Sequence, residues 1–338
     1  MAPRAFITGL SGLTLTAEER AFLREARPWG LILFKRNIQD KTQVTDLVHE
    51  ALHEVGGDAP VLIDQEGGRV QRLQPPHWPA YPPGAAYGRI HDRDPEAGLA
   101  AARLGARLIS ADLAELGINV DCLPLADVPV SGADNVIGDR AYGETPDKVA
   151  AIALAVAEGL MAGGVLPVLK HIPGHGRANA DSHERLPVVH ASRATLEATD
   201  FAAFRPLKRL PLAMTAHVVF TAFDPVSPAT TSATMIGQVI RGFIGFDGLL
   251  MSDDVSMGAL SGSIAERTRA SLAAGCDVVL HCNGNLDEMR AVASEAPELS
   301  GEAARRAAAA LAVRKSPSGI DLAAARREFA AMMQTGIA

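Results

Sequence analysis

The chain has 338 residues, of which 48% are hydrophobic and 21% charged, a composition typical of water-soluble globular proteins. Its net charge of −7 comes from dispersed charges without a run of lysines or arginines, so nucleic acid is not expected as a partner. The three cysteines, Cys122, Cys276 and Cys282, show no CxxC spacing. They predict neither a disulfide framework nor a thiolate metal site, and they favour a reducing, cytoplasmic location.

Two apolar segments resemble targeting or membrane elements but carry interruptions. Glycines break the N-terminal run "AFITGLSGL", which predicts a strand and not a signal peptide. The window from Ala150 is almost long enough to span a bilayer, but Glu158, Gly163 and Pro167 divide it. A buried helix followed by a buried strand is predicted there, and no membrane partner is expected.

Short apolar runs without polar alternation recur along the chain, as in strands that are covered on both faces of a parallel sheet. Eight such runs occur: "AFITGL" near residue 5, "GLILF" at 30, "PVLID" at 60, "NVDCLPL" at 119, "LPVLK" at 166, "LAMTAH" at 212, "GLLMSDD" at 248 and "DVVLHC" at 277. They predict eight strands.

Amphipathic segments with helix-boundary signals lie between these runs. Thr16 and Glu19 form a capping box, Asp94-Pro95 begins a second helix, and Gly117 ends it. Eight strand–helix units predict an α/β fold, a (β/α)₈ TIM-type barrel, in preference to an open sheet. The barrel is predicted to form a single domain over residues 1–338, with an alanine-rich helical extension from about residue 300 packing on its outside.

Polar residues collect where the predicted strands end, which in a barrel is the mouth that carries the chemistry. These residues are Asp64, Lys170, His171, His217, Asp253, Asp254 and His281. Strand ends also meet solvent, and this simpler account is preferred for His217 and His281 taken singly. Several acidic and basic groups at one mouth nevertheless indicate a site.

The stretch "KHIPGHGRANADSHERLP" after the fifth strand is rich in histidine. His171 and His175 have the i, i+4 spacing of a helical zinc site, but Pro173 and its neighbouring glycines exclude a helix. A loop metal site is left as an alternative, although the first strand, "ITGL", lacks the H-x-H pair usual in barrel metallohydrolases. No metal is predicted.

The same stretch carries Asp181 and His183 two residues apart on a glycine-hinged loop. An aspartate that accepts a hydrogen bond from one imidazole nitrogen leaves the other nitrogen free to give or take a proton. A surface Asx turn beside an unrelated histidine is the simpler interpretation, and these residues alone favour it.

Longer motifs resolve this ambiguity, because the chain resembles the β-N-acetylglucosaminidases of glycoside hydrolase family 3, specifically the single-domain bacterial enzymes of peptidoglycan recycling. The motifs that carry the resemblance are "LILFKRN" at 31, "IDQEGGRVQRL" at 63, "NVIGDRAYG" at 135, "KHIPGHG" at 170, "DSHERLP" at 181 and "MSDDVSMGAL" at 251. They span most of the predicted barrel and occur in the family's order at its strand ends.

The resemblance implies that Asp253 is the nucleophile and that His183 is the general acid and base, oriented by Asp181. Adjacent strand residues point to opposite sides, so only one of Asp253 and Asp254 should face the mouth. The resemblance selects Asp253 and leaves Asp254 a structural role. It further implies a sugar-binding set made up of Asp64, Arg72, Arg140, Lys170 and His171.

Two positions depart from the family pattern. Ile172 replaces a usual phenylalanine, and Arg177 stands where a small or acidic residue is common. The first could alter packing beneath the loop, and the second could change contacts with the leaving group.

The implied activity is removal of a terminal β-linked N-acetylglucosamine with retention of configuration, without a cofactor. The implied substrates are peptidoglycan fragments in which this sugar is joined to 1,6-anhydro-N-acetylmuramic acid, with or without peptide, and a monomer is expected. The alternatives are a family 3 β-glucosidase or β-xylosidase, a barrel aldolase that uses Lys170 as a Schiff base, and a non-catalytic sugar-binding protein.

Overall fold

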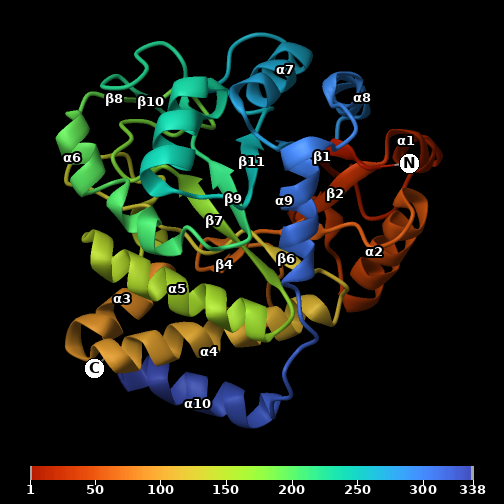
Figure 1. Cartoon of the computed structure of the whole chain (residues 1–338). Coiled ribbons are helices and arrows are strands. Elements are labelled where there is room, and N and C mark those ends of the chain that lie inside the picture. Colours follow the sequence, from red (N-terminus) through yellow and green to blue (C-terminus); the bar gives the residue numbers. More distant parts are fainter. Residues whose placement is uncertain (1, 336–338) are drawn as a thin grey trace.

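A computed structural model describes residues 2–335 and shows a closed parallel barrel surrounded by helices (Figure 1). The eight predicted strands all form, and neighbours around the barrel follow chain order before the last strand closes on the first. The barrel strands are β1 (Arg4–Gly9), β2 (Pro28–Leu33), β3 (Val61–Ile63), β6 (Val120–Asp121), β7 (Leu166–Ile172), β9 (Leu212–Thr215), β11 (Leu249–Asp254) and β12 (Val278–His281). The predicted (β/α)₈ barrel is therefore confirmed.

Helices connect the strands and cover the outside of the barrel (Figure 1). The α-helices are α1 (Ala17–Ala26), α2 (Lys41–Val55), α3 (Gly84–Arg93), α4 (Pro95–Ala114), α5 (Pro146–Ala162), α6 (Arg193–Ala198), α7 (Ile264–Ala274), α8 (Leu286–Glu295), α9 (Gly301–Ala312) and α10 (Leu322–Thr335). Shorter or wider helical segments are η1 (Lys35–Asn37), η2 (Gly138–Arg140), η3 (Ala202–Leu207), η4 (Ala229–Thr231) and the π-helix η5 (Met235–Ile244).

The predicted helix boundaries have the expected chemistry. The Thr16 hydroxyl accepts from the Glu19 amide at 3.1 Å, and the Glu19 carboxylate accepts from the Thr16 amide at 2.9 Å, which completes the capping box of α1. Asp94 caps α4 through the amides of the first turn, and Pro95 occupies the first helical position.

Two small sheets outside the barrel were not predicted. The antiparallel hairpin of β4 (Gln65–Gly67) and β5 (Val70–Gln71) follows β3, and β8 (Val188–Val189) pairs with β10 (Val219–Phe220). Their strands are too short for a hydrophobic period. At Gly67 the backbone has φ +93°, and a Cβ atom would collide with the carbonyl oxygen of Pro82, so the hairpin needs glycine there.

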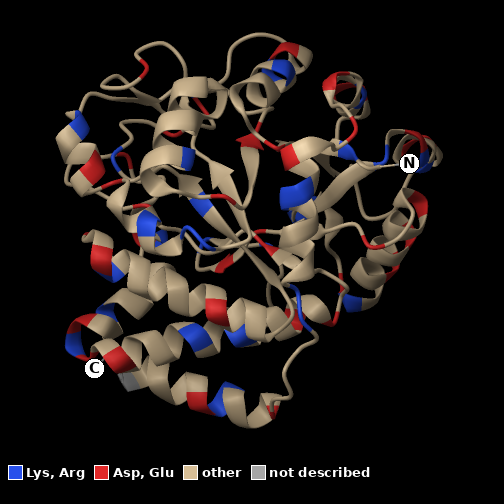
Figure 2. Ribbon diagram, viewed as in Figure 1, with Lys and Arg blue, Asp and Glu red and all other residues tan. Residues whose placement is uncertain are grey.

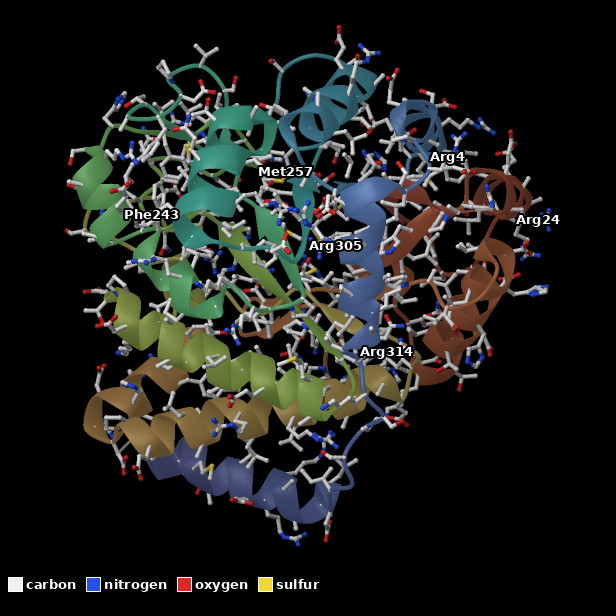
Figure 3. All side chains as sticks on the ribbon, in the orientation of Figure 1. Arg4, Arg24, Phe243, Met257, Arg305 and Arg314 are labelled. Atoms are coloured by element: carbon white, nitrogen blue, oxygen red, sulfur yellow. The ribbon has the colours of Figure 1, made fainter. Side chains whose placement is uncertain are left out.

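Side chains along each barrel strand point alternately into the barrel and toward the helices, and this alternation divides the core into two layers. On β1, Ile7 belongs to the cluster inside the barrel, whereas Phe6 belongs to the cluster between the strands and the helices. Side chains fill the space between the ribbons (Figure 3). Charged residues are interspersed in sign over the outer helices (Figure 2). Among the described residues no helix has the length and apolar character needed to cross a bilayer.

The two C-terminal helices lie on the outside of the barrel, α9 beside the strands and α10 along α4 (Figure 1). Arg326 of α10 donates to Asp112 of α4 at 2.6 Å. The Phe329 ring lies 6.3 Å from that of Tyr81 and 6.4 Å from that of Tyr87. This contact ties the end of the described chain to the segment that follows the β4–β5 hairpin.

Candidate active site

The carboxyl ends of the barrel strands surround a cavity of about 260 Å³. This volume is slightly smaller than the range of roughly 300–1,000 Å³ that is usual for small-molecule sites. All eight residues that the resemblance implied line this cavity, namely Asp64, Arg72, Arg140, Lys170, His171, Asp181, His183 and Asp253. The structure therefore brings together residues that lie up to 189 positions apart in the sequence.

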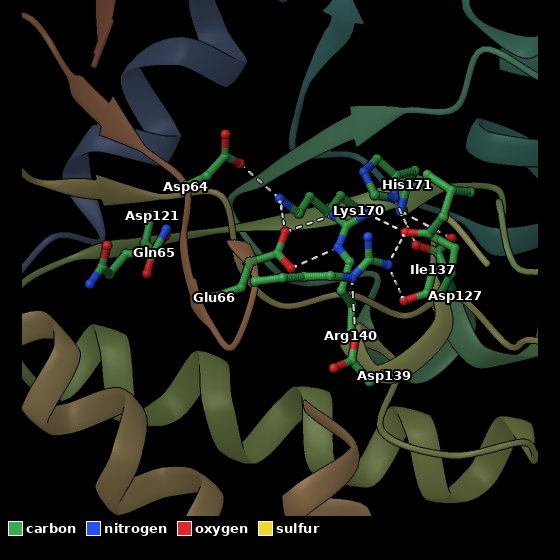
Figure 4. Close-up of polar contacts among 12 residues, drawn as sticks. Asp64, Gln65, Glu66, Asp121, Asp127, Ile137, Asp139, Arg140, Lys170 and His171 are labelled. Atoms are coloured by element: carbon green, nitrogen blue, oxygen red, sulfur yellow. Dashed lines mark hydrogen bonds and ion pairs between the residues drawn. The ribbon is translucent and has the colours of Figure 1, made fainter. Parts of the chain in front are cut away.

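A buried network of alternating charges forms one wall (Figure 4). Lys170, at the end of β7, lies with its Nζ 2.9 Å from Asp64 Oδ1 and 2.6 Å from Glu66 Oε1. Arg140 in η2 donates to both oxygens of Glu66, through Nε at 2.9 Å and Nη2 at 2.7 Å. Planar bidentate pairing of this kind is strong and fixes geometry. Glu66 thus holds in place two cations of the predicted sugar-binding set.

Each charged group in this network stabilises the ionised form of its neighbours, which burial alone would disfavour. Burial would raise the pKa of Asp64, but Lys170 and Arg72 outweigh it and hold that pKa well below its usual range. The pKa of Glu66 is lowered to about 2 by Lys170 and Arg140 against the effect of burial. Burial disfavours the Lys170 ammonium, yet the carboxylates of Asp64 and Glu66 raise its pKa. All of these groups are therefore charged at neutral pH.

Arg72 directly follows the β4–β5 hairpin and does not lie on a helix. Its Nη2 donates to Asp64 Oδ2 at 2.9 Å, and its guanidinium carbon lies 5.1 Å from the centroid of the Phe34 ring. Asp64 is thus held by one cation on each oxygen. This arrangement fixes the carboxylate without covering it on the cavity side.

Asp127 orients His171, the histidine of the predicted sugar-binding set. Its Oδ2 lies 2.7 Å from His171 Nδ1, and its Oδ1 accepts from the His175 amide at 2.6 Å. Burial would raise the pKa of Asp127, but His171 and His175 lower it, so the carboxylate is ionised. A charged acceptor at Nδ1 favours the proton there and leaves His171 Nε2 for the cavity.

Asp253, the candidate nucleophile, lies at the end of β11. Its Oδ1 accepts from the Asp254 amide at 2.8 Å, and its own amide donates to Thr215 Oγ1 at 3.3 Å. Burial would raise the pKa of Asp253, but the nearby His217 and His171 and the Asp254 amide lower it. The carboxylate is therefore ionised at neutral pH, as a nucleophile requires.

The prediction that only one acid of the pair faces the mouth is wrong, because both Asp253 and Asp254 line the cavity. The pairing of β11 with β12 shifts register between Met251 and Asp254, and this irregularity breaks the strict alternation. The Asp254 carboxylate is occupied by Ser256, whose hydroxyl donates at 2.6 Å, and by the Cys282 amide at 3.1 Å. These bonds tie the ends of β11 and β12 together.

Asp181 and His183 lie on the dyad loop, residues 174–185, which follows β7 and forms the opposite side of the cavity. His183 Nδ1 lies 2.8 Å from Asp181 Oδ1, and the His183 amide donates to the same oxygen at 2.9 Å. Burial raises the pKa of Asp181, but the hydrogen bonds from His183 lower it by more, so the pKa of this carboxyl lies below its usual value. The dyad that the spacing allowed is formed, and His183 Nε2 is left for proton transfer.

The other strand-end histidines have internal partners. His217 lies with Nδ1 2.7 Å from Thr230 Oγ1 and Nε2 3.0 Å from the Asp254 carbonyl oxygen, and His281 Nε2 lies 3.0 Å from Glu288. Neither lines the cavity. Both side chains are fully buried, so the expectation that these two histidines meet solvent at their strand ends is wrong, and their internal bonds account for them instead. Within residues 2–335, no group of three or more His, Cys, Asp or Glu is arranged to hold a metal ion.

Arg177, one of the two departures from the family pattern, points away from the cavity. Its Nε and Nη2 donate to Asp200 Oδ2 at 3.0 and 2.9 Å, and Nη2 also donates to Thr199 at 3.1 Å. The expectation that Arg177 could contact the leaving group is therefore not supported by its position. The other departure, Ile172, is fully buried in the helix-side core.

Glu66 and Asp127 were missed by the sequence reasoning. Glu66 lies within the quoted motif "IDQEGGRVQRL", two residues after Asp64, and Asp127 lies in the loop after β6. The rule that acids near strand ends gather at the mouth applies to both. Which cations these two carboxylates contact depends on long-range folding, and no local motif indicates it.

Known proteins resemble this chain over most of its length. Residues 7–313 match the glycosyl hydrolase family 3 N-terminal domain. A β-hexosaminidase of Alkalilimnicola ehrlichii is 41% identical over 281 residues, which cover 81% of this chain and 79% of that protein. A β-hexosaminidase of Bordetella avium is 36% identical over 289 residues, 84% of this chain and 81% of that protein. The crystal structure of NagZ from Neisseria gonorrhoeae in complex with N-trifluoroacetyl-D-glucosamine has a TM-score of 0.86 at 32% identity, over 99% of this chain and 98% of that one.

Proposed function

This chain belongs to glycosyl hydrolase family 3 and is an exo-β-N-acetylglucosaminidase, and we propose that it acts by double displacement through Asp253 and His183. The observation that carries the proposal is that an ionised carboxylate, a histidine–aspartate dyad and a fixed set of polar groups line one small cavity. A cavity of about 260 Å³ suits one terminal sugar and not an internal segment of a long glycan.

In the first step, Asp253 attacks the anomeric carbon while His183 protonates the leaving oxygen. Asp253 Oδ1 is held by the Asp254 amide, so Oδ2 is the oxygen available for the new bond. His183 then takes a proton from water, which attacks the glycosyl-enzyme and releases the sugar with retained configuration. Asp181 supports both roles, because it holds Nδ1 and favours the imidazolium that forms in the second step.

The charged wall serves to hold the sugar. Ionised Asp64 can accept from sugar hydroxyls, while Lys170, Arg140 and Arg72 donate to ring oxygens or to the acetamido carbonyl. Because these groups are already fixed to one another, little ordering is left for substrate binding to achieve. His171 contributes Nε2 from the position that Asp127 sets.

We further propose that the natural substrates are peptidoglycan fragments that carry N-acetylglucosamine on 1,6-anhydro-N-acetylmuramic acid, with or without peptide, and that the protein works as a cytoplasmic monomer in peptidoglycan recycling. The resemblance to single-domain bacterial family members supports the substrate. The three free, buried cysteines suit a reducing compartment.

The experiment that tests this function is release of 4-nitrophenol from its N-acetyl-β-glucosaminide by wild type and by Asp253→Ala, each with and without a chelator. Wild-type turnover that survives chelation and collapses in the variant supports a metal-free glycosidase with Asp253 as nucleophile. Absence of turnover, or loss on chelation alone, refutes it.

Two rival activities are separated by simple controls. Faster turnover of the plain glucoside or xyloside than of the N-acetylglucosaminide would indicate the other family 3 specificities. The aldolase hypothesis fits the geometry poorly. Lys170 contacts two carboxylates that keep its ammonium group protonated, whereas formation of a Schiff base needs a neutral amine. Borohydride should therefore trap no carbonyl substrate on Lys170.

A further inference from the structure

The dyad loop alternates between exposed and buried side chains at its catalytic tip. Ser182 is 3% exposed, while the side chains on either side of it are 33% exposed for Asp181 and 69% exposed for His183. Ser182 is thus the inward-pointing residue between the two members of the dyad. Any contact that it makes restrains both of them.

Ser182 makes its inward contact with a second histidine of the same loop. Its hydroxyl lies 3.1 Å from His175 Nε2, and His175 is itself 3% exposed. The His175 amide donates to Asp127, which also orients His171, and the two imidazole rings lie edge to face with centroids 5.8 Å apart. The tip of the loop is therefore linked through His175 to the carboxylate that positions a residue of the sugar-binding set.

The base of the dyad loop is held by contacts that do not involve Ser182 or His175. Arg177 pairs with Asp200, and a Cβ atom on Gly176 would collide with the backbone of Val128. At the tip, the carbonyl oxygens of Ser182 and His183 accept from backbone amides of the β11–α7 segment, at 3.1 and 3.2 Å. These backbone bonds hold one side of the tip, and the Ser182 hydroxyl holds the other.

We propose that His175 and Ser182 are positioning residues that hold the Asp181–His183 dyad over the cavity in register with the sugar-binding set. This inference rests on the proposed function, because the task of the dyad is protonation of the leaving oxygen. Burial and the neighbouring His171 lower the pKa of His175 to about 4, so its imidazole is neutral at neutral pH. A neutral ring can share one proton with the Ser182 hydroxyl without an added charge in the interior.

The role has a chemical signature that a purely structural role lacks. A sugar leaving group needs protonation as the bond breaks, whereas 4-nitrophenolate leaves readily without it. Displacement of His183 by about 1 Å should therefore slow cleavage of a substrate with a sugar leaving group far more than cleavage of a 4-nitrophenyl substrate. Sugar binding should change much less, because Ser182 lines the cavity but contacts none of the charged groups of the opposite wall.

The test compares Ser182→Ala and His175→Gln with wild type on two substrates, an N-acetylglucosamine β-disaccharide and 4-nitrophenyl N-acetyl-β-glucosaminide. For Ser182→Ala we expect kcat/KM to fall about 10- to 100-fold on the disaccharide but less than about threefold on the nitrophenyl substrate. The inhibition constant of N-acetylglucosamine should change less than about threefold. His175→Gln places an amide nitrogen near the position of Nε2 and should retain most of the disaccharide activity. Ser192→Ala, which removes the cap of α6, is the matched serine control and should behave as wild type.

Trypsin cleavage after Arg185, an exposed residue of the same loop, tests the Ser182–His175 tether, the hydrogen bond between these two side chains, independently of enzyme activity. We expect cleavage after Arg185 to be several-fold faster in Ser182→Ala than in wild type or Ser192→Ala under native conditions. Equal cleavage rates, or equal losses on both substrates, would overturn the inference. An inactive wild type would refute the proposed function instead, and the trypsin comparison would still decide whether the tether exists.

Discussion

Replacement of Lys170 by methionine tests the charged wall most directly. The Lys170 side chain is 2% exposed and its Nζ lies within 2.9 Å of two carboxylates. Methionine nearly preserves the volume, so the main effect is loss of the cation between Asp64 and Glu66. Removal of one partner from a buried ion pair destabilises proteins by about 3–5 kcal/mol, and we expect a loss in this range at pH 8.

The loss should depend on pH with a definite sign. In the variant, burial acts on Asp64 and Glu66 without the Lys170 charge, so their pKa values rise and a carboxyl group takes up a proton as the pH falls. The stability deficit should therefore shrink between pH 8 and pH 5, measured by urea unfolding. Lys41→Met removes the exposed pair with Glu115 and should cost less than about 1 kcal/mol at both pH values. A Lys170→Met deficit below about 1 kcal/mol at pH 8, or one that is constant with pH, would refute the reasoning.

Three further outcomes follow from the same contacts. Asp253→Asn should lower kcat/KM about 1,000-fold or more in the nitrophenol assay, whereas Asp254→Asn should mainly lower stability, by about 1–3 kcal/mol, and equal kinetic losses would contradict the assigned roles. Arg177→Ala should destabilise the protein by about 1–3 kcal/mol in thermal unfolding, because it leaves the buried Asp200 without its guanidinium, while KM stays near wild type. His175 has its pKa lowered from 6.5 to about 4, so the folded protein binds fewer protons than the unfolded chain between these values. Stability should fall by up to roughly 3 kcal/mol as pH drops through that window, and His175→Gln should remove this part of the slope in unfolding curves.

Much of the barrel could be predicted because each strand carries its own signal. A run such as "LPVLK" is buried on both faces and needs no knowledge of its neighbours to be recognised. The β4–β5 hairpin lacks such a signal, since its strands have three and two residues and its shape depends on a glycine packed against Pro82. This hairpin is nevertheless what brings Glu66 and Arg72 to the mouth.

The candidate site likewise contains residues whose place could be predicted from the sequence and contacts that could not. Strand-end logic placed Asp64, Lys170 and Asp253 at one mouth, because that depends only on where strands end. The pairing of Glu66 with Arg140 is different, because 74 residues separate them and only the closed barrel brings them within 2.7 Å. The inward placement of Asp254 depended on a local register shift that alternation cannot predict.

The packing of α10 has a consequence for how the protein tolerates shortening. Phe329 and Arg326 hold Tyr81, whose amide donates to the Gln71 side chain and whose carbonyl oxygen accepts from Gly68 in the hairpin. The last helix is thus a remote brace for the active-site wall. We expect that deletion of α10 would leave the barrel's strand pairing intact but loosen sugar binding, so that a trimmed protein would show a raised KM before it lost its fold.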